Sequence, residues 1–345
     1  MGATVGRRVD STQTYGRAPA DLGSRRERRQ PFAEPGSAGR ERQAARGVST
    51  AEVTAPWEAV PRRRLISARW RNPIGIVGAG IVGLCILTAV FGRFIWTTDP
   101  NAPDAERLLG PSWDHPFGTD DLGRDTLARV IHGAQVSLQV GAVAISIALV
   151  AGTLIGLLAG YYRGIVDLLL MRLVDVMFAF PGLVLAIVIA GLLGATRRNA
   201  MIAIGIIITP AFARVVRAAV LEVMGFPFIE SARALGAGGF RIMVRHLIPN
   251  IVAPLIVLTT VYFSTAILSE ATLSFLGLGT QPPEAAWGNM LSTARSYIDQ
   301  SVWMSVFPGA AIMLIVLGFN FLGDGLRDVL DPRIGGGVGD AVVNK

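Results

Sequence analysis

The chain has 345 residues, of which 51% are hydrophobic and only 17% are charged, and 40 of them are glycine. A soluble domain carries about 25% charged residues, so this chain has too few of them to cover a water-facing surface. The single cysteine, Cys85, excludes an internal disulfide, and three scattered histidines do not supply a zinc cage. The composition excludes a large soluble enzyme, a disordered regulator and a disulfide-stapled secreted module, and it indicates a polytopic membrane protein.

The net charge of +7 comes from the N-terminal segment. Residues 1–72 contain 15 arginines and seven acids, whereas the other residues contain 17 basic and 18 acidic side chains. The first ~55 residues show no apolar period and are rich in Arg, Ala, Gly, Ser and Pro, so we expect them to be disordered. Aromatic residues do not interleave with these arginines, and acids are spread among them, which argues against nucleic-acid binding and against an organelle transit peptide.

Six apolar segments follow, which we interpret as transmembrane helices because about 20 apolar residues cross the hydrocarbon layer. The third contains Arg172 and Asp175, whose spacing of three predicts that they neutralise each other near the inner interface. We interpret the prolines within the spans as kinks that a membrane helix tolerates. The predicted spans are about Pro73–Gly92, Val136–Tyr161, Leu168–Leu193, Ala200–Ala213, Ile251–Leu273 and Val302–Leu322.

The arginines predict the orientation of these spans. An even number of spans places both termini on one side of the membrane. With the termini in the cytoplasm, the inner flanks hold 13 arginines and the outer segments hold seven, which agrees with the positive-inside rule. Arg197 and Arg198 lie outside in this arrangement and are an exception that the sequence does not explain.

The loop between the fourth and fifth spans, GFPFIESARALGAGGFRIMVRHLIPN at 225–250, has helical periodicity but no run of membrane length. Pro227 suits a helix start, and Glu230 then meets the positive end of the helix dipole. Gly236 suits a left-handed residue that ends the helix. A second short helix is predicted to have one apolar face and to end at Pro249; its apolar residues are Phe240, Met243, Val244 and Leu247.

Such a helix–glycine–helix elbow has the right shape to dock into a groove of a partner protein. It is equally compatible with an amphipathic loop that lies on lipid headgroups, and the periodicity does not distinguish these two possibilities. Its sequence resembles the EAA loop of bacterial ABC importer permeases. The chain departs from that pattern by having Ser231 in place of Ala, His246 in place of a hydrophobic residue and Ile248 in place of Leu. The residues that match the pattern are Glu230, Ala232, Gly236 and Pro249.

Three further stretches resemble the second permease subunit of dipeptide, oligopeptide and nickel importers. They are HPFGTDDLGRD at 115–125 in the first outer loop, LSFLGLG with AWG at 273–288, and FLGDGLRD with DPR at 321–333. The outer-loop signature contributes Gly118, Asp120, Gly123, Arg124 and Asp125. Its acids lack the spacing of a calcium loop, so we interpret the stretch as a polar turn over the outer mouth that contacts the solute receptor.

The resemblance covers residues 60–333 and implies an all-α, type I ABC importer permease fold, MetI-like, with six transmembrane helices. It also implies that the short helix of the loop docks into a cleft of the ATP-binding subunit. The residues predicted to couple to the ATPase are Phe228, Glu230, Ser231, Ala232, Arg233, Gly236, Arg241 and Arg245.

Glu270 is an acid inside an apolar span, where ionisation costs roughly 2.5–3.5 kcal/mol. It is interpreted either as a pathway residue that meets a substrate amino group or as a hydrogen-bonding residue that joins two helices, and the second interpretation is slightly favoured. Asp175 is the other candidate for the pathway. No Walker A motif, catalytic triad or metal-ligand cluster is present in the sequence, so the subunit is expected to be catalytically silent and to bind no cofactor, with ATP and Mg²⁺ on partner subunits.

The leading hypothesis is a permease of a peptide importer in a bacterial cytoplasmic membrane. The expected partners are a second permease, two ATP-binding subunits, an extracytoplasmic binding protein and membrane lipid, and no nucleic acid. Nickel or haem import is the alternative within the family; a channel or secondary carrier, and a regulator acting through the arginine-rich segment, are the other classes. The predicted regions are a disordered extension (1–60), a first span with the outer loop (61–133), the permease domain (134–333) and a flexible tail (334–345).

Overall fold

The computed structural model describes residues 73–330, and within that range all regular secondary structure is helical apart from two isolated β-bridges in the outer loop. The all-α class predicted from the sequence is therefore confirmed for this part of the chain. The predictions for the disordered extension, for the C-terminal tail and for the motif residues 331–333 lie outside the described residues.

Within residues 73–330, five helices are long and apolar enough to span a membrane, counting the stretch from Gly239 to Phe275 as one, and a bent pair supplies a sixth candidate. The long α-helices are α2 (Pro73–Ile95), α3 (Thr126–Tyr162), α6 (Arg197–Val223), α9 (Ile248–Phe275) and α11 (Trp303–Leu330). The bent pair is α4 (Gly164–Phe178) and α5 (Gly182–Leu193). The short elements are α7 (Pro227–Ala234), α8 (Gly239–Ile242), η2 (Met243–Leu247), α10 (Trp287–Ala294) and η3 (Arg295–Tyr297).

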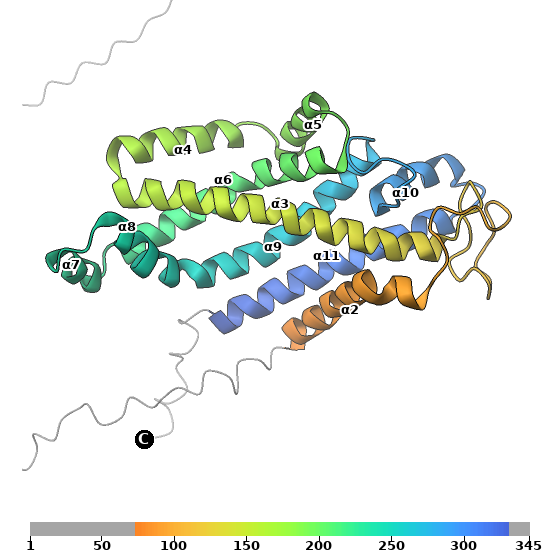
Figure 1. The fold of residues 1–345 in the computed structure, drawn as a ribbon, viewed down its shortest axis with the longest axis horizontal. Helices are drawn as coiled ribbons and strands as arrows, with labels where there is room; N and C mark the ends of the chain where they lie inside the picture. The colour runs from red at the N-terminus through yellow and green to blue at the C-terminus, as the bar shows by residue number, and fades with distance from the viewer. Residues whose placement is uncertain (1–72, 331–345) are drawn as a thin grey trace, which may run out of the picture. The chain divides into compact units, whose positions relative to one another are not determined.

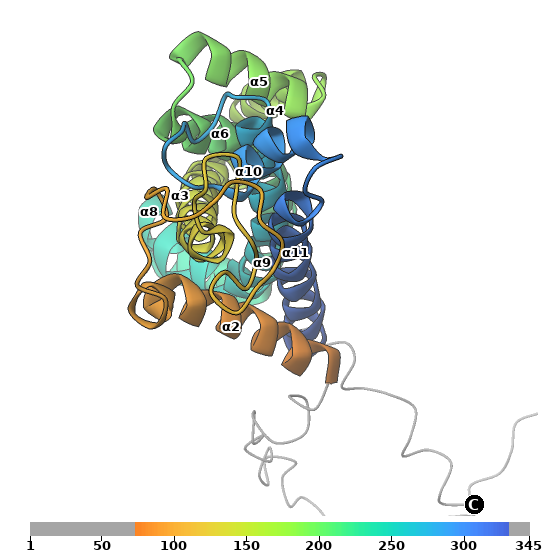
Figure 2. The ribbon, with the colours of Figure 1, turned by 90° about the vertical axis from the view of Figure 1, so that its right-hand side faces the viewer.

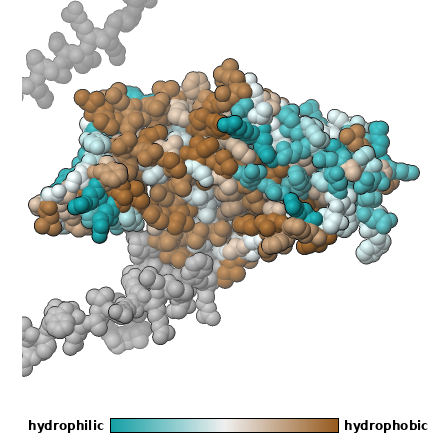
Figure 3. Space-filling model, viewed as in Figure 1, coloured by the Kyte–Doolittle hydropathy of each residue, from teal (hydrophilic) through white to brown (hydrophobic). Residues whose placement is uncertain are grey.

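The helices α3, α6 and α9 run side by side through the middle of this unit (Figures 1 and 2). The pair α4 and α5 lies along one side of them, and α2 and α11 lie along the other. The short helices α7 and α8 are at one end, and α10 with the first outer loop is at the opposite end. A broad apolar surface covers the spans in Figure 3, and polar side chains gather at the end formed by the outer loop.

The third predicted span corresponds to the bent pair α4 and α5. The two helices are bent by 90° between Phe178 and Gly182, a sharper bend than a tolerated kink. The cause is Pro181, which has no N–H to continue the helical hydrogen bonds and which disfavours a helical conformation at Phe180. Pro210 and Pro254, in contrast, lie inside the continuous helices α6 and α9, as expected for membrane helices.

Close packing joins α3 to α6 through three glycines spaced by four residues, Gly152, Gly156 and Gly160. A Cβ atom added at Gly156 would lie 2.5 Å from the carbonyl oxygen of Ala213, which is too close for any side chain. Small residues at this spacing let two membrane helices approach backbone to backbone. We call this contact between α3 and α6 the glycine seam; its spacing of four residues is visible in the sequence.

Candidate functional site

The elbow at 225–250 begins as the sequence predicts. Helix α7 has Pro227 in its first turn, with Glu230 also in that turn. At its end, Gly236 has φ of +81°, a conformation that glycine adopts without strain. The N–H of Gly236 donates to the carbonyl of Arg233 at 2.9 Å, and the N–H of Ala237 donates to that of Ala232 at 3.0 Å. These two bonds form a Schellman motif, so the predicted helix stop is confirmed.

The elbow exposes large apolar side chains. Leu235 is 89% exposed and Phe240 is 77% exposed, and Phe226 and Phe228 are also exposed. Ile229 is fully buried and fixes α7 to the rest of the protein. Of the predicted coupling residues, Ala232 is half-buried and Gly236 lies at the turn; the exposed side chains are Phe228, Glu230, Ser231, Arg233, Arg241 and Arg245. An apolar surface of this kind, rimmed by charges, is typical of a protein contact site.

The second half of the elbow differs from the prediction of one shared apolar face. Met243 and Leu247 are buried, but Phe240 and Val244 are exposed. From Met243 onward the reason is the π-helical turn η2, in which the N–H of Ile248 donates to the carbonyl of Met243. Five residues instead of four close this turn, so a period of 3.6 no longer identifies the buried face.

Pro249 does not end the helix, contrary to the prediction. The chain continues without a break from Gly239 to Phe275. Proline removes a hydrogen bond to the carbonyl four residues earlier and clashes with it. The wider π turn directly before Pro249 lets the helix pass this position, as π-bulges do elsewhere.

The elbow rests on the end of α3. A Cβ atom added at Gly239 would lie 2.8 Å from the hydroxyl oxygen of Tyr161, so the Tyr161 side chain packs directly against the backbone at Gly239. The guanidinium of Arg233 lies over the Tyr161 ring, 5.9 Å from its centroid. Through these contacts, the elbow touches the last turn of α3 as well as the two helices it connects.

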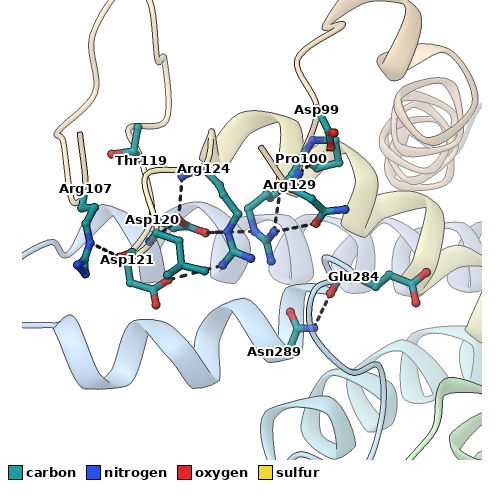
Figure 4. Close-up of polar contacts among 12 residues, drawn as sticks. Asp99, Pro100, Arg107, Thr119, Asp120, Asp121, Arg124, Arg129, Glu284 and Asn289 are labelled. Carbon is teal, nitrogen blue, oxygen red and sulfur yellow. Dashed lines mark hydrogen bonds and ion pairs between the residues drawn. The ribbon is translucent and has the colours of Figure 1, made fainter. Parts of the chain in front are cut away.

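At the other end of the molecule, the outer-loop signature forms a buried polar cluster (Figure 4). The Asp120 carboxylate accepts hydrogen bonds from the backbone N–H and the Nε of Arg124, at 2.9 and 2.6 Å. Arg129 lies 3.5 Å from the same carboxylate through its Nε, and its Nη1 donates to the Pro100 carbonyl at 2.8 Å. Arg129 is one of the seven outer arginines, and its place at the start of an apolar span beside the acidic motif is the feature of the sequence that indicates this role.

Asp125 connects this cluster to α3. As N-cap, its carboxylate accepts from the Ala128 N–H at 2.7 Å. The same carboxylate accepts from the Trp96 indole at 3.2 Å and contacts Nδ1 of His115 at 2.8 Å. One carboxylate therefore ties the end of α2, the outer loop and the start of α3 together.

The two glycines of the signature are required by the loop geometry. Gly118 and Gly123 have φ of +73° and +78°. A Cβ atom added at Gly118 would lie 2.3 Å from the Leu109 carbonyl oxygen, and one at Gly123 would lie 2.2 Å from that of Ala105. The signature residues therefore come together as one rigid unit, which we call the outer-loop cluster, and contact with a solute receptor stays a prediction.

The acids within the spans have partners. Glu270 is 1% exposed and accepts hydrogen bonds from Ser137 of α3 at 3.1 Å and from Ser274 at 2.7 Å. This is the helix-joining bond of the second interpretation, and a pathway role stays a prediction. Asp175 does not pair with Arg172 as predicted; it accepts from Arg214 of α6 at 2.7 Å.

The structure gives one of the two exceptional outer arginines a partner. Arg197, at the start of α6, forms an ion pair with Glu284 in the loop before α10. The Glu284 carbonyl in turn accepts from the Asn289 side chain at 2.8 Å (Figure 4). Arg197 thus has a structural role on the loop side, which a count of charges does not reveal.

Comparison with known proteins identifies the family. Residues 152–336 match the model of the binding-protein-dependent transport system inner membrane component. The dipeptide transport system permease protein DppC of Alkalihalophilus pseudofirmus is 46% identical over 79% of this chain and 90% of its own length. The glutathione transport system permease protein GsiD of Escherichia coli is 46% identical over 84% of this chain and 94% of its own.

Among solved structures, the MetNI methionine ABC transporter is similar over 58% of this chain and 95% of the matched chain, with 22% identity and a TM-score of 0.47. The family model covers more than half of the chain, and relatives at 46% identity cover most of it. The protein therefore belongs to the binding-protein-dependent transport system inner membrane components and is an ABC importer permease of the same type as DppC and GsiD.

Proposed function

We propose that this permease carries dipeptides and other short peptides inward across a bacterial cytoplasmic membrane. It forms the pathway with a second, related permease and receives its solute from an extracytoplasmic binding protein. Two separate ATP-binding subunits bind ATP and Mg²⁺ and supply the energy. The names of the relatives support the substrate class, because one is a dipeptide permease and glutathione is a tripeptide.

The observation that carries the coupling part of the proposal is the exposed elbow. Phe228, Leu235 and Phe240 present apolar side chains to solvent at the end of the helices opposite the outer-loop cluster (Figure 1). We assign this end to the cytoplasm, together with both termini. Docked into an ATP-binding subunit, α7 moves when the two ATP-binding subunits close, and α6 and α9 carry the movement across the membrane.

A glycine pair within the elbow tests this coupling. Gly236→Pro forces φ from +81° to about −65° and removes the N–H that closes the helix. Gly238→Ala is the matched control, because Gly238 has φ of −68° and no atom lies within 4 Å of an added Cβ. Gly236→Ala, a milder strain of about 1 kcal/mol, gives an intermediate case.

With the complete transporter reconstituted in vesicles, we expect Gly236→Pro to insert normally and to lower peptide-stimulated ATP hydrolysis and uptake by more than about tenfold, whereas Gly238→Ala behaves like the wild type. The reason is that the proline redirects the tip of α7 without touching the spans. Unchanged stimulated ATP hydrolysis in Gly236→Pro is the outcome that rejects the elbow as the coupling element.

A further inference from the structure

A groove of about 720 Å³ lies between α2 and α3 on the side of the helices. Its floor is formed by Phe263 of α9 and Phe319 of α11, which stack with ring centroids 4.2 Å apart. Its walls are apolar side chains of α2 and α3, including Val90 and Leu138. The volume falls within the roughly 300–1,000 Å³ of ligand sites.

Three polar side chains line this groove: Arg93 in the last turn of α2, and Gln135 and Gln139 one turn apart on α3. All three are exposed. Among the residues that the structure describes, neither glutamine amide has a hydrogen-bond partner, and the Arg93 guanidinium lies over the ring of its neighbour Phe94. The described lining contains no acid, so the groove carries one uncompensated positive charge.

The depth of these groups matches a lipid head region. The charge-free stretch of α3 from Val130 to Tyr162 is about 50 Å long at 1.5 Å per residue, against about 30 Å of hydrocarbon. About 10 Å at each end therefore lies in the interface. Gln135 lies about 7.5 Å into this stretch and Gln139 about 13.5 Å, on either side of the boundary where glycerol esters meet acyl chains.

We propose that this groove binds a glycerophospholipid of net charge −1, such as phosphatidylglycerol, from the outer leaflet. The Arg93 guanidinium donates to the phosphate, and the amide groups of Gln135 and Gln139 donate to the phosphate and ester oxygens. An acyl chain then lies over the Phe263 and Phe319 rings. The lipid head group then lies beside the three polar side chains of the groove, and the acyl chain lies along its apolar part.

The competing occupant is a transmembrane helix of a second subunit. A helix would bring apolar side chains along the whole groove and would leave the Arg93 charge without an anion. Polar residues within membrane segments are rare and usually have a partner, and a monoanionic lipid satisfies all three groups at once. Charge complementarity therefore favours the lipid.

Native mass spectrometry tests the proposal on the full-length chain, produced with its partner subunits, extracted in mild detergent and given a fixed amount of phosphatidylglycerol. We expect Arg93→Gln to retain about fivefold less of this lipid than the wild type, since an arginine near an anionic lipid surface contributes about that factor. Gln135→Leu with Gln139→Leu is expected to lower retention as well. Arg198→Gln, which removes an exposed outer arginine away from the groove, is the control and retains the wild-type amount.

A second measurement identifies the occupant in intact cell membranes. Gln139→benzoylphenylalanine places a photoreactive group in the groove, and irradiation is expected to increase the mass of this chain by one phospholipid. A cross-link to another polypeptide overturns the proposal and identifies a subunit contact. Equal lipid retention by the wild type and the three groove substitutions also overturns it. Neither readout involves transport, so failure here leaves the proposed function untouched.

Discussion

One set of variants around the hydrogen-bonded Glu270 distinguishes a structural role of this residue from a role in transport. The N–H of Thr280 donates to the hydroxyl of Ser274 at 3.0 Å, Ser274 donates to Glu270 at 2.7 Å, and Ser137 donates to the same carboxylate at 3.1 Å. These three hydrogen bonds connect α9 to the loop that follows it and to α3. Glu270→Gln keeps both serine contacts because an amide accepts from one hydroxyl and donates to the other.

The expected losses follow from these contacts. Ser137→Ala removes one hydrogen bond to the carboxylate. A hydrogen bond to a charged group contributes about 1.5–3 kcal/mol to stability, and one between membrane helices about 0.6–1.7 kcal/mol, so we expect a loss of about 1–2 kcal/mol. Glu270→Ala removes two bonds and leaves a cavity at a residue that is 1% exposed, for roughly 3–4 kcal/mol. Glu270→Gln is expected to lose less than about 1 kcal/mol.

Thermal unfolding of the purified transporter and peptide uptake by vesicles are measured on the same samples. At roughly 2–4 °C per kcal/mol, Glu270→Ala lowers Tm by about 6 °C or more, Ser137→Ala by a few degrees, and Glu270→Gln by less than about 4 °C. Uptake per folded transporter stays near the wild-type value in Glu270→Gln. Ser269→Ala is the control, because its hydroxyl bonds only its own helix, at the Thr265 carbonyl.

One result would refute the structural role of Glu270. If Glu270→Gln kept the wild-type Tm but lost most of its uptake, the negative charge itself would be needed during transport, and Glu270 would be a pathway residue. Loss of uptake in strict proportion to loss of folded protein across the set supports the structural role.

Two further predictions concern the packing of α3 and of the outer loop. Gly156→Leu should prevent accumulation of folded protein, because a Cβ atom at this position already lies 2.5 Å from the Ala213 carbonyl oxygen. Gly83→Leu is the control and should be tolerated, because nothing lies within 4 Å of an added Cβ atom there. The yield of folded protein is measured for both by gel filtration after detergent extraction, and equal yields would contradict the role of the glycine seam. Asp120→Asn removes the carboxylate that contacts both Arg124 and Arg129 and leaves Asp121 as the acid beside Arg124, which costs about 1.5–3 kcal/mol. Limited proteolysis should cut the outer loop faster than in the exposed control Asp104→Asn, and equal rates would show that the outer-loop cluster is not rigid.

The sequence predicts local features of this protein well. The start of α7 at Pro227 and its end at Gly236 each depend on one residue and its immediate neighbours, so caps and turn chemistry suffice to place them. The same is true of most spans, because an apolar run of sufficient length crosses the membrane whatever packs around it.

Features that depend on distant residues are the ones the sequence does not reveal. Asp175 pairs with Arg214, 39 positions away, whereas spacing along one helix suggested Arg172. The buried face of the elbow follows from a π turn at Met243–Leu247, and no periodicity rule anticipates that turn. Likewise, Arg129 joins the outer-loop cluster only because the loop folds back onto the first turn of α3.

The contrast between the glycine seam and α4 indicates which parts of the permease move together. Around Gly156 the backbones of α3 and α6 are in direct contact, so we expect the two helices to move as one body when the elbow is displaced. Helix α4 is held to α6 differently, by the Asp167–Arg217 and Asp175–Arg214 ion pairs, whose side chains are 19–51% exposed.

Ion pairs of that kind contribute about 0–1 kcal/mol each, and α4 buries only Val174. A movement of α4 about the bend at Pro181 therefore uncovers little buried surface, whereas α5 buries Ala186 and Ala190 and stays packed in the core. If ATP-driven closure displaces the elbow, we expect the helices of the glycine seam to carry the displacement and α4 to be the element that changes its position relative to them.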